Sequence, residues 1–278
     1  MTNSLQCTRD ARGVVTVTLN RPNTRNAFDE AMINDLHRTV TALDADASVR
    51  VIILAAVGPC FCAGADIAWM QRAAHQDEAT NLADARRFAH MMAALSACRK
   101  PIIARVQGAA FGGGVGLICA ADIAIASTNA RFAISEAKFG ILPAVIGPYL
   151  VHAVGKRQAL RLALNANIID ADEALAIGLL HKVVDSHALD QTVELTVTEL
   201  LGNGPLALAE IKCLFNQLST APIDEHTREL TARTISRVRA TPEARLGFDA
   251  FIHKHPPTWQ IPPALNNADT AERTEPTQ

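Results

Sequence analysis

Aromatic residues are scarce in this 278-residue chain, at 4% of the sequence. The apolar core must therefore come mainly from Ala, Val, Ile and Leu, within an apolar content of 49%. An excess of either charge is also missing, since the formal net charge is -2 at pH 7. A balance this close to zero argues against nucleic acid or an acidic membrane surface as partner, and it still allows small basic pockets.

Several signals for targeting, metals and common hydrolases are also absent. The N-terminus lacks an apolar signal core, and no apolar run reaches the length of a membrane helix. The six cysteines are scattered, and Cys60-Phe-Cys62 lacks the two-residue spacer of a metal or redox pair. Neither G-x-S-x-G nor H-E-x-x-H occurs. We therefore expect a cytoplasmic, metal-free protein with reduced thiols.

Hydrophobic periodicity predicts an α/β chain. Residues 14–19 alternate as in a half-buried strand, and 51–56 are apolar enough for the interior of a parallel sheet. Further strands are expected at 101–107, 122–127, 131–134 and 183–184. Helices are expected from near Asp29 for about four turns, and at 79–97, 148–154, 156–164, 172–177, 187–201, 205–218, 224–239 and 242–254.

The most informative stretch runs from Gly108 to Asp122. An apolar strand leads into three adjacent glycines, 112–114, and then into a segment that reads as a buried helix. Such a turn leaves amide N–H groups at a helix N-terminus, where negative charge is favoured. The spacing fits no dinucleotide or P-loop motif, because Leu117 replaces the last glycine and no lysine follows. An oxyanion hole, a phosphate site and simple tight packing all remain open from this stretch alone.

Three motifs together carry a resemblance. Phe61-Cys-Ala-Gly-Ala-Asp-Ile67, Gly108–Asp122 and Ser135-Glu-Ala-Lys-Phe-Gly140 closely resemble the enoyl-CoA hydratase/isomerase (crotonase) family, over roughly Val14 to Lys254. The resemblance implies a spiral of ββα turns over 1–200 and a C-terminal helical region used for trimerisation over 201–255. We expect a disordered tail over 256–278. It also implies a homo-trimer or homo-hexamer and an acyl-CoA substrate, with coenzyme A as part of that substrate and no bound cofactor.

The resemblance also assigns roles to residues. The oxyanion N–H donors carry over onto Ala65 and Gly113, and the acid/base onto Glu136. Gly116 stands where family hydratases have a first glutamate. For Asp66, capping of the next helix is an alternative to substrate contact, and Arg25 and Lys254 could be ordinary surface charges. The expected substrate or CoA contacts are Arg25, Ala27, Ala63, Asp66, Ile67, Gly112, Pro143, Phe251 and Lys254.

A single carboxylate leaves the reaction open. Glu136 could hydrate a 2-enoyl thioester or isomerise a 3-enoyl thioester, and an inert acyl-CoA-binding protein is a third reading. The segment Glu136–Tyr149, with Ala-Val-Ile after its first proline, resembles bacterial methylglutaconyl-CoA and carboxygeranoyl-CoA hydratases when taken together with Gly-Gly-Gly-Val-Gly at 112–116. This resemblance favours hydration of a branched or carboxylated substrate. Arg72 is a candidate cation for such a carboxylate, or an exposed helix arginine. The acyl pocket is expected between 67–95 and 139–149.

Overall fold

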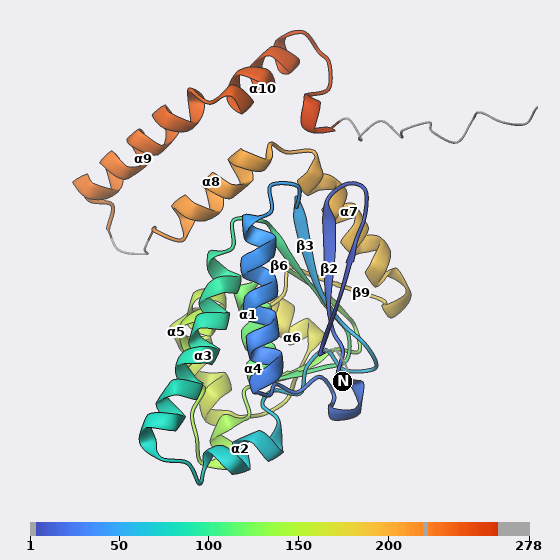
Figure 1. Cartoon of the computed structure of the whole chain (residues 1–278), viewed down its shortest axis with the longest axis vertical. Coiled ribbons are helices and arrows are strands. Elements are labelled where there is room, and N and C mark those ends of the chain that lie inside the picture. Colours follow the sequence, from blue (N-terminus) through green and yellow to red (C-terminus); the bar gives the residue numbers. More distant parts are fainter. Residues whose placement is uncertain (1–3, 219–221, 261–278) are drawn as a thin grey trace, which may run out of the picture.

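The computed structural model describes residues 4–218 and 222–260. Its larger sheet has six strands in the order β1-β2-β3-β4-β6-β9 (Figure 1). All neighbouring pairs from β2 onward are parallel, as predicted, and β1 pairs antiparallel with β2 at the edge. The strands are β1 (Leu5–Arg9), β2 (Val14–Leu19), β3 (Val51–Ala56), β4 (Ile102–Val106), β6 (Ile123–Ser127) and β9 (Lys182–Val184).

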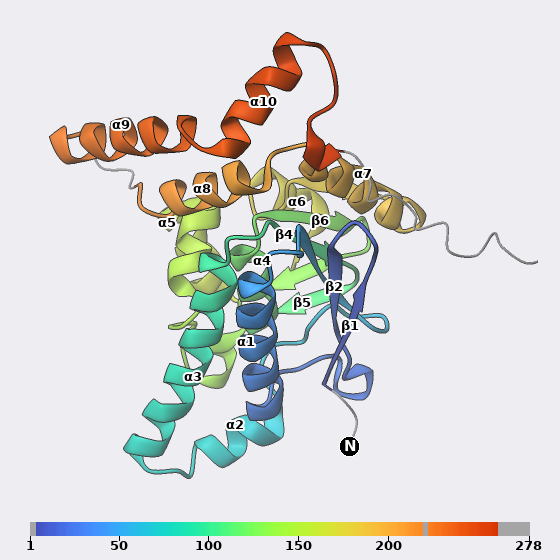
Figure 2. The same cartoon turned by 45° about the horizontal axis from the view of Figure 1, so that its top comes forward.

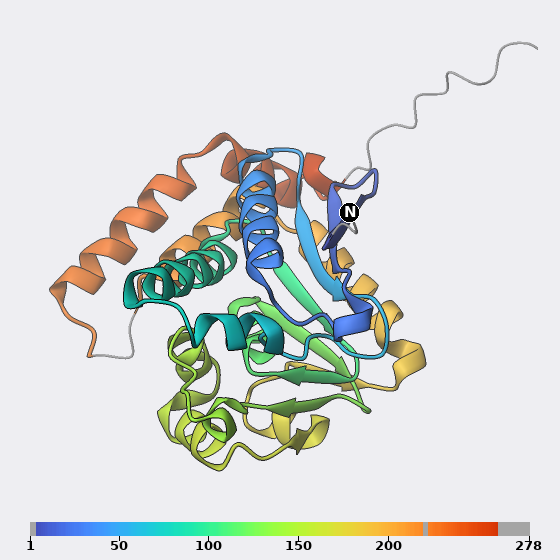
Figure 3. The same cartoon turned by 60° about the horizontal axis from the view of Figure 1, so that its bottom comes forward.

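A second, three-stranded sheet runs across the first (Figure 3). It consists of β5 (Ala109–Phe111), β7 (Arg131–Ala133) and β8 (Ile169–Asp170). β5 pairs in parallel with β7, and β7 pairs antiparallel with β8. The chain steps from the large to the small sheet twice, from β4 to β5 and from β6 to β7, and a helix follows each step. These are the expected ββα turns, so the predicted crotonase-type fold is confirmed.

Alternate residues of the strands face two different apolar clusters. Ile52 and Leu54 of β3 belong to the larger cluster, whereas Val51 faces α7. The period of two places successive side chains on opposite faces, so both faces of the sheet are covered. Helices contributing buried residues to the larger cluster are α1 (Glu30–Ala45), α3 (Glu78–Ala97), α4 (Gly113–Ala120), α5 (Gly147–Asn165) and α6 (Ala171–Ala176), and α7 (Leu189–Leu201) covers the other face.

Local signals explain where the helices begin and break. Asp29 caps α1 by accepting a hydrogen bond from the Met32 amide at 2.9 Å, which confirms the helix expected there. Inside α5, Gly155 has φ 75° and ψ 155°, which are not helical angles. The two helices predicted on either side of residue 155 are therefore present, separated by a kink.

The C-terminal helices are α8 (Pro205–Phe215), α9 (Glu225–Arg239) and α10 (Pro242–Ile252). α8 lies against the body, and α9 and α10 reach away from it (Figures 1 and 2). Lys212 ties α8 to the sheet, because its Nζ lies 2.6 Å from a carboxylate oxygen of Asp122 and 2.9 Å from the Lys100 carbonyl oxygen. Ordered structure continues past the predicted boundary at 256, since Thr258–Gln260 form a 3-10 helix and the Trp259 indole donates to the Gly202 carbonyl. The rest of the predicted tail, 261–278, lies outside the described residues.

Among residues 4–218 and 222–260, no helix combines the length and apolarity that a bilayer crossing requires. A cytoplasmic location and a trimeric or hexameric state remain predictions. Side chains on α10 bear on the second of these, because Phe251 is 85% exposed and Ile252 is 70% exposed in the single chain.

Candidate active site

Two glycine-bearing loops, one after β3 and one after β5, lie in direct contact. The Phe111 amide donates to the Cys62 carbonyl at 2.9 Å, and Cys62 forms a parallel bridge with Ala110. Gly64 has φ 93°, and a Cβ there would lie 2.9 Å from the Phe111 carbonyl oxygen. Glycine is therefore required at 64 both by the backbone conformation and by the close approach of the second loop.

The loops present two backbone amides, those of Ala65 and Gly113, that have no protein acceptor among residues 4–218 and 222–260. The neighbours of Ala65 are engaged, since Gly64 accepts from the Phe28 amide and the Asp66 amide donates to Phe28, both at 2.7 Å. Gly113 is the first residue of α4. Within the described residues, neither the Ala65 nor the Gly113 N–H donates to a protein acceptor. Free N–H groups at a helix N-terminus and on an adjacent loop are suited to a developing oxyanion.

The carboxylate of Glu136 lies beside this pair of amides. Glu136 follows β7 and opens a short 3-10 helix, Glu136–Phe139. A Cβ built on Gly112, the residue before the second amide, would lie 2.9 Å from Glu136 Oε1. The small sheet holds the two together, because the Gly112 amide donates to the Ala133 carbonyl at 2.8 Å.

The surroundings of Glu136 keep its carboxyl poorly solvated. Burial raises the pKa of this carboxyl above its ordinary value, and nearby amides of residues 135 and 136 oppose that shift. In the described part of the chain, Glu136 Oε2 is buried without a hydrogen-bond partner. A carboxylate that lines the cavity and has a raised pKa is a suitable acid/base.

The position of the missing first glutamate is closed by a hydrophobic side chain. Gly116 is buried in α4, and a Cβ there would lie 2.3 Å from Ile146 Cγ2 and 2.9 Å from Ile146 Cβ. Met92 Cε would lie 3.5 Å away. A side chain at 116 would therefore overlap Ile146, which itself lines the cavity.

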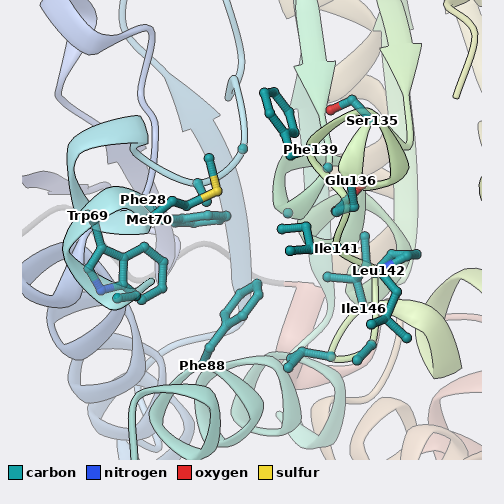
Figure 4. A pocket seen from close by; sticks show the side chains of 18 of the residues that line it. Phe28, Trp69, Met70, Phe88, Ser135, Glu136, Phe139, Ile141, Leu142 and Ile146 are labelled. Atoms are coloured by element: carbon teal, nitrogen blue, oxygen red, sulfur yellow. The ribbon is translucent and has the colours of Figure 1, made fainter. Parts of the chain in front are cut away.

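A cavity of about 480 Å³ joins these groups (Figure 4). Ala65, Gly113 and Glu136 all line it. Its walls come from α2 (Ile67–Ala73), α3 and the segment 139–146, which are the ranges expected for the acyl pocket. Figure 4 shows Trp69 and Phe88 across the cavity from Glu136. The lining is mainly apolar, as an acyl chain requires.

Comparison with known proteins identifies the family. A family model described as enoyl-CoA hydratase/isomerase matches residues 9–262. The chain belongs to the enoyl-CoA hydratase/isomerase family. A solved enoyl-CoA hydratase from Shewanella pealeana is 40% identical with a TM-score of 0.89, and the match covers 93% of this chain and 97% of that one.

Relatives with named activities include both hydratases and an isomerase. The crotonyl-CoA hydratase of Syntrophomonas wolfei is 34% identical over 242 residues, which is 85% of this chain and 90% of that protein. The 1,2-epoxyphenylacetyl-CoA isomerase of Escherichia coli is 31% identical over 250 residues, which is 88% of this chain and 94% of that protein. Membership of the enoyl-CoA hydratase/isomerase family therefore does not by itself choose the reaction.

The structure places four of the nine expected substrate or CoA contacts at the cavity. Ala63, Ile67, Gly112 and Pro143 all line it. Asp66 instead caps α2, accepting from the Ala68 amide at 2.9 Å, which confirms the capping alternative. It also forms an ion pair with Arg21 at 3.2 Å.

The remaining expected CoA contacts lie outside the cavity lining. Arg25 is exposed and left-handed at φ 53°, while Ala27 is buried nearby and its carbonyl accepts from Arg21. Phe251 and Lys254 lie at the end of α10 and do not line the cavity of the described chain. Their contact with CoA remains a prediction. The family resemblance implies that a neighbouring subunit often supplies this contact.

Cys62 and Arg72 are next to lining residues in the chain but do not line the cavity themselves. Burial raises the pKa of the Cys62 thiol to about 12, so this cysteine is an unreactive core thiol. Arg72 lies 3.4 Å from Glu30, is 57% exposed and does not line the cavity. The exposure of Arg72 supports its interpretation as an exposed helix arginine and not as a cation of the acyl pocket.

Sequence reasoning missed several lining residues individually. Phe28 and Phe88 form a tilted ring pair with centroids 5.6 Å apart at the oxyanion end. The detectable signal was on α3, where Asn81, Asp84, Ala85 and Phe88 recur at helical spacing on one face. Ile146 carried no such signal, because its role depends on contact with a residue 30 positions earlier.

Proposed function

We propose that this protein hydrates a 2-enoyl-CoA, with Glu136 as its sole acid/base and the Ala65 and Gly113 amides as the oxyanion hole. The observation that carries the proposal is the position of Glu136 Oε1 against Gly112, next to the second free amide. Hydratase names among the relatives support the reaction type.

One carboxylate is sufficient if both new bonds form on one face of the double bond. The oxygen of a water bonds to C3 of the enoyl group while Glu136 takes one of its protons. The π electrons move onto the thioester oxygen, where the two amides stabilise the enolate. Glu136, now a carboxylic acid, then returns the proton to C2. Removing one such amide typically lowers turnover by about 100- to 1000-fold, so the pair carries much of the rate enhancement.

The direction of the Glu136 pKa shift supports this double role. A group that must accept and then return a proton works best when its pKa is near the working pH. Burial moves the pKa of Glu136 in that direction. Ile146 over Gly116 supports the single-carboxylate mechanism, because it occupies the space a second acid/base would need.

The lining also bears on the acyl group. The titratable residues that line the cavity in the described chain are Asp84 and Glu136, both acidic, and no Lys or Arg joins them. Asp84 is paired with Arg87, which does not line the cavity, so a second carboxylate on the substrate would face two carboxylates with no cation in the lining. We therefore retain a branched acyl group and propose that it carries no ionised carboxylate.

Three substrates test the reaction. Hydration of crotonyl-CoA should remove the absorbance of the conjugated enoyl thioester, and 3-hexenoyl-CoA should be left unchanged. 3-Methylglutaconyl-CoA should be hydrated more slowly than crotonyl-CoA because it carries a free carboxylate. A gain of conjugated absorbance from 3-hexenoyl-CoA would instead establish isomerisation, and tight binding with no spectral change would favour an inert acyl-CoA-binding protein.

Matched glutamate variants make the test specific. Glu136→Gln keeps the shape of the side chain and removes the base, so turnover should fall while affinity for the thioester remains. Glu199→Gln alters an exposed glutamate of α7 and serves as the control. Full activity of Glu136→Gln would show that another group is the base.

A further inference from the structure

Two histidines and one aspartate lie together at the end of α10, outside the lining of the cavity. They are Asp249, His253 and His255, and one possible ligand atom from each lies within 4.8 Å of the other two. Nδ1 of His253 lies 3.1 Å from Oδ1 of Asp249, and Nε2 of His255 lies 3.4 Å from Oδ2. Among residues 4–218 and 222–260, this is the one group of three His, Cys, Asp or Glu side chains that could share a metal ion.

The backbone at the end of α10 brings the three side chains together. Asp249 and His253 are four residues apart, so they share one face of the helix. The His255 amide donates to the Ala250 carbonyl at 3.0 Å, and Lys254 is left-handed at φ 55°. This hydrogen bond and this conformation are those of a Schellman turn. The turn leads the chain back over the last helical residues, and the His255 ring thereby faces the carboxylate of Asp249.

The hydrogen bonds of both rings leave acceptors facing one another. Nδ1 of His255 lies 3.1 Å from the carbonyl oxygen of Pro256, which can only accept, so Nδ1 carries the proton. Nε2 of the neutral ring is then itself an acceptor, and it faces a carboxylate oxygen. Nδ1 of His253 is also next to two acceptors of Asp249, the carboxylate and, at 3.0 Å, the carbonyl oxygen. A cation between these atoms would remove the repulsion.

The distances and the ligand types fit a transition-metal ion. Zn²⁺ binds imidazole nitrogen and carboxylate oxygen at about 2.0–2.2 Å, usually in a tetrahedron. Neighbouring ligand atoms of such an ion are about 3.3 Å apart, and the two nitrogen–oxygen distances here are 3.1 and 3.4 Å. Two imidazoles disfavour Mg²⁺ and Ca²⁺, which prefer oxygen ligands. A metal-binding histidine also commonly donates its second ring N–H to a carbonyl, as His255 does to Pro256.

We propose that Asp249, His253 and His255 bind a divalent ion of the zinc type, which fastens the end of α10 to the chain that follows it. Their side chains are between 52% and 63% exposed, so an ion can enter from solvent. Phe251 and Lys254 lie between the ligands, and a bound ion therefore fixes the turn that carries these two expected CoA contacts. The spacing Asp-x-x-x-His-x-His is neither of the metal patterns sought in the sequence, which is why a metal-free protein was expected.

Equilibrium dialysis against Zn²⁺ at neutral pH tests the site in the full-length protein without an affinity tag. The wild type should hold one more Zn²⁺ per chain than Asp249→Asn, His253→Gln or His255→Gln, because loss of one ligand should weaken binding by about 100-fold or more. His226→Gln removes an exposed histidine of α9 and should keep the zinc content of the wild type. A zinc content equal to that of the wild type in the three cluster variants would overturn the inference.

Hydrogen exchange measures what the ion does to the turn. Zn²⁺ should slow amide exchange over residues 250–256 several-fold in the wild type and leave it unchanged in His255→Gln. Exchange over α1 is the internal reference and should not respond to Zn²⁺ in either protein. Slower exchange on acidification, with no response to Zn²⁺, would show that a proton and not a metal ion lies between His255 and Asp249, and the inference would then be wrong. Neither measurement depends on the proposed hydration.

Discussion

The effect of Gly116→Ala on the stability of the protein depends on how tightly Ile146 packs against residue 116. In an open helix, replacing Gly by Ala stabilises a protein by about 1 kcal/mol. At residue 116 the added Cβ would lie 2.3 Å from Ile146 Cγ2 and 2.9 Å from Ile146 Cβ. These are the inner atoms of a buried, β-branched side chain, so they cannot swing aside as the end of a flexible chain would.

The magnitude follows from the two opposing contributions. Forcing one extra carbon into a packed core costs about 1–3 kcal/mol, which exceeds the gain in helix propensity. We expect Gly116→Ala to lower the free energy of unfolding by up to about 2 kcal/mol. Equilibrium unfolding in urea measures this quantity, with a lower midpoint at an unchanged slope.

A double-mutant cycle tests the cause. In the Ile146→Ala background Cγ2 is gone, so Gly116→Ala should cost about 1 kcal/mol less there than in the wild-type protein. Ile146→Val keeps Cγ2 and should give no such relief. A Gly116→Ala protein that is more stable than wild type, or an equal cost in all three backgrounds, would refute the idea that Ile146 closes this position.

The other predictions concern the reacting groups and the C-terminal helices. Glu136→Gln should lower kcat by about 100- to 10,000-fold, and kcat/KM of the wild type should rise with pH through a pKa above 4.5, because the ionised form is the base. Because the pKa of Glu136 is higher in the folded state, the folded protein keeps this proton longer, and native stability falls as pH rises from 4.5 to the pKa of folded Glu136. Glu136→Gln lacks this loss of stability. Its thermal midpoint should therefore exceed that of wild type by more at pH 8 than at pH 4. Ala65→Pro removes an N–H that has no protein acceptor in the described chain, and stopped-flow turnover should drop by about 100-fold or more without loss of affinity for CoA. Lys212→Met leaves Asp122 without its cation, and chemical denaturation should show a loss of about 3 kcal/mol, a result that a merely exposed ion pair would not give.

Much of the fold was accessible from local patterns. The apolar run 51–56 predicted a strand inside a parallel sheet, and the alternation of 14–19 predicted a half-buried strand. Both strands are present, but β2 is covered on both faces and has no exposed residue. β1 was missed because Leu5 is its only buried residue, and an edge strand of this kind carries no periodic signal. β5 was hidden inside the glycine stretch, since three residues are too few for a period.

The candidate site divides in a similar way. Residues in contiguous motifs, such as Ala65, Gly113 and Glu136, could be proposed from the sequence because each loop carries its own signature. Contacts between distant segments could not. Ile146 against Gly116 depends on how α5 meets α4, and the pairing of Arg72 with Glu30 depends on how α2 meets α1.

The two sides of the cavity are attached to the protein in different ways. Gly112 and Glu136 are joined through the small sheet, whereas α2 and α3 form one excursion of the chain between β3 and β4. We therefore expect that the segment 67–88 can be exchanged between relatives as a cassette. Grafting this cassette from a relative with another acyl preference should transplant selectivity while the proton-transfer apparatus stays in register, which makes it the natural target for laboratory evolution of new thioester specificities.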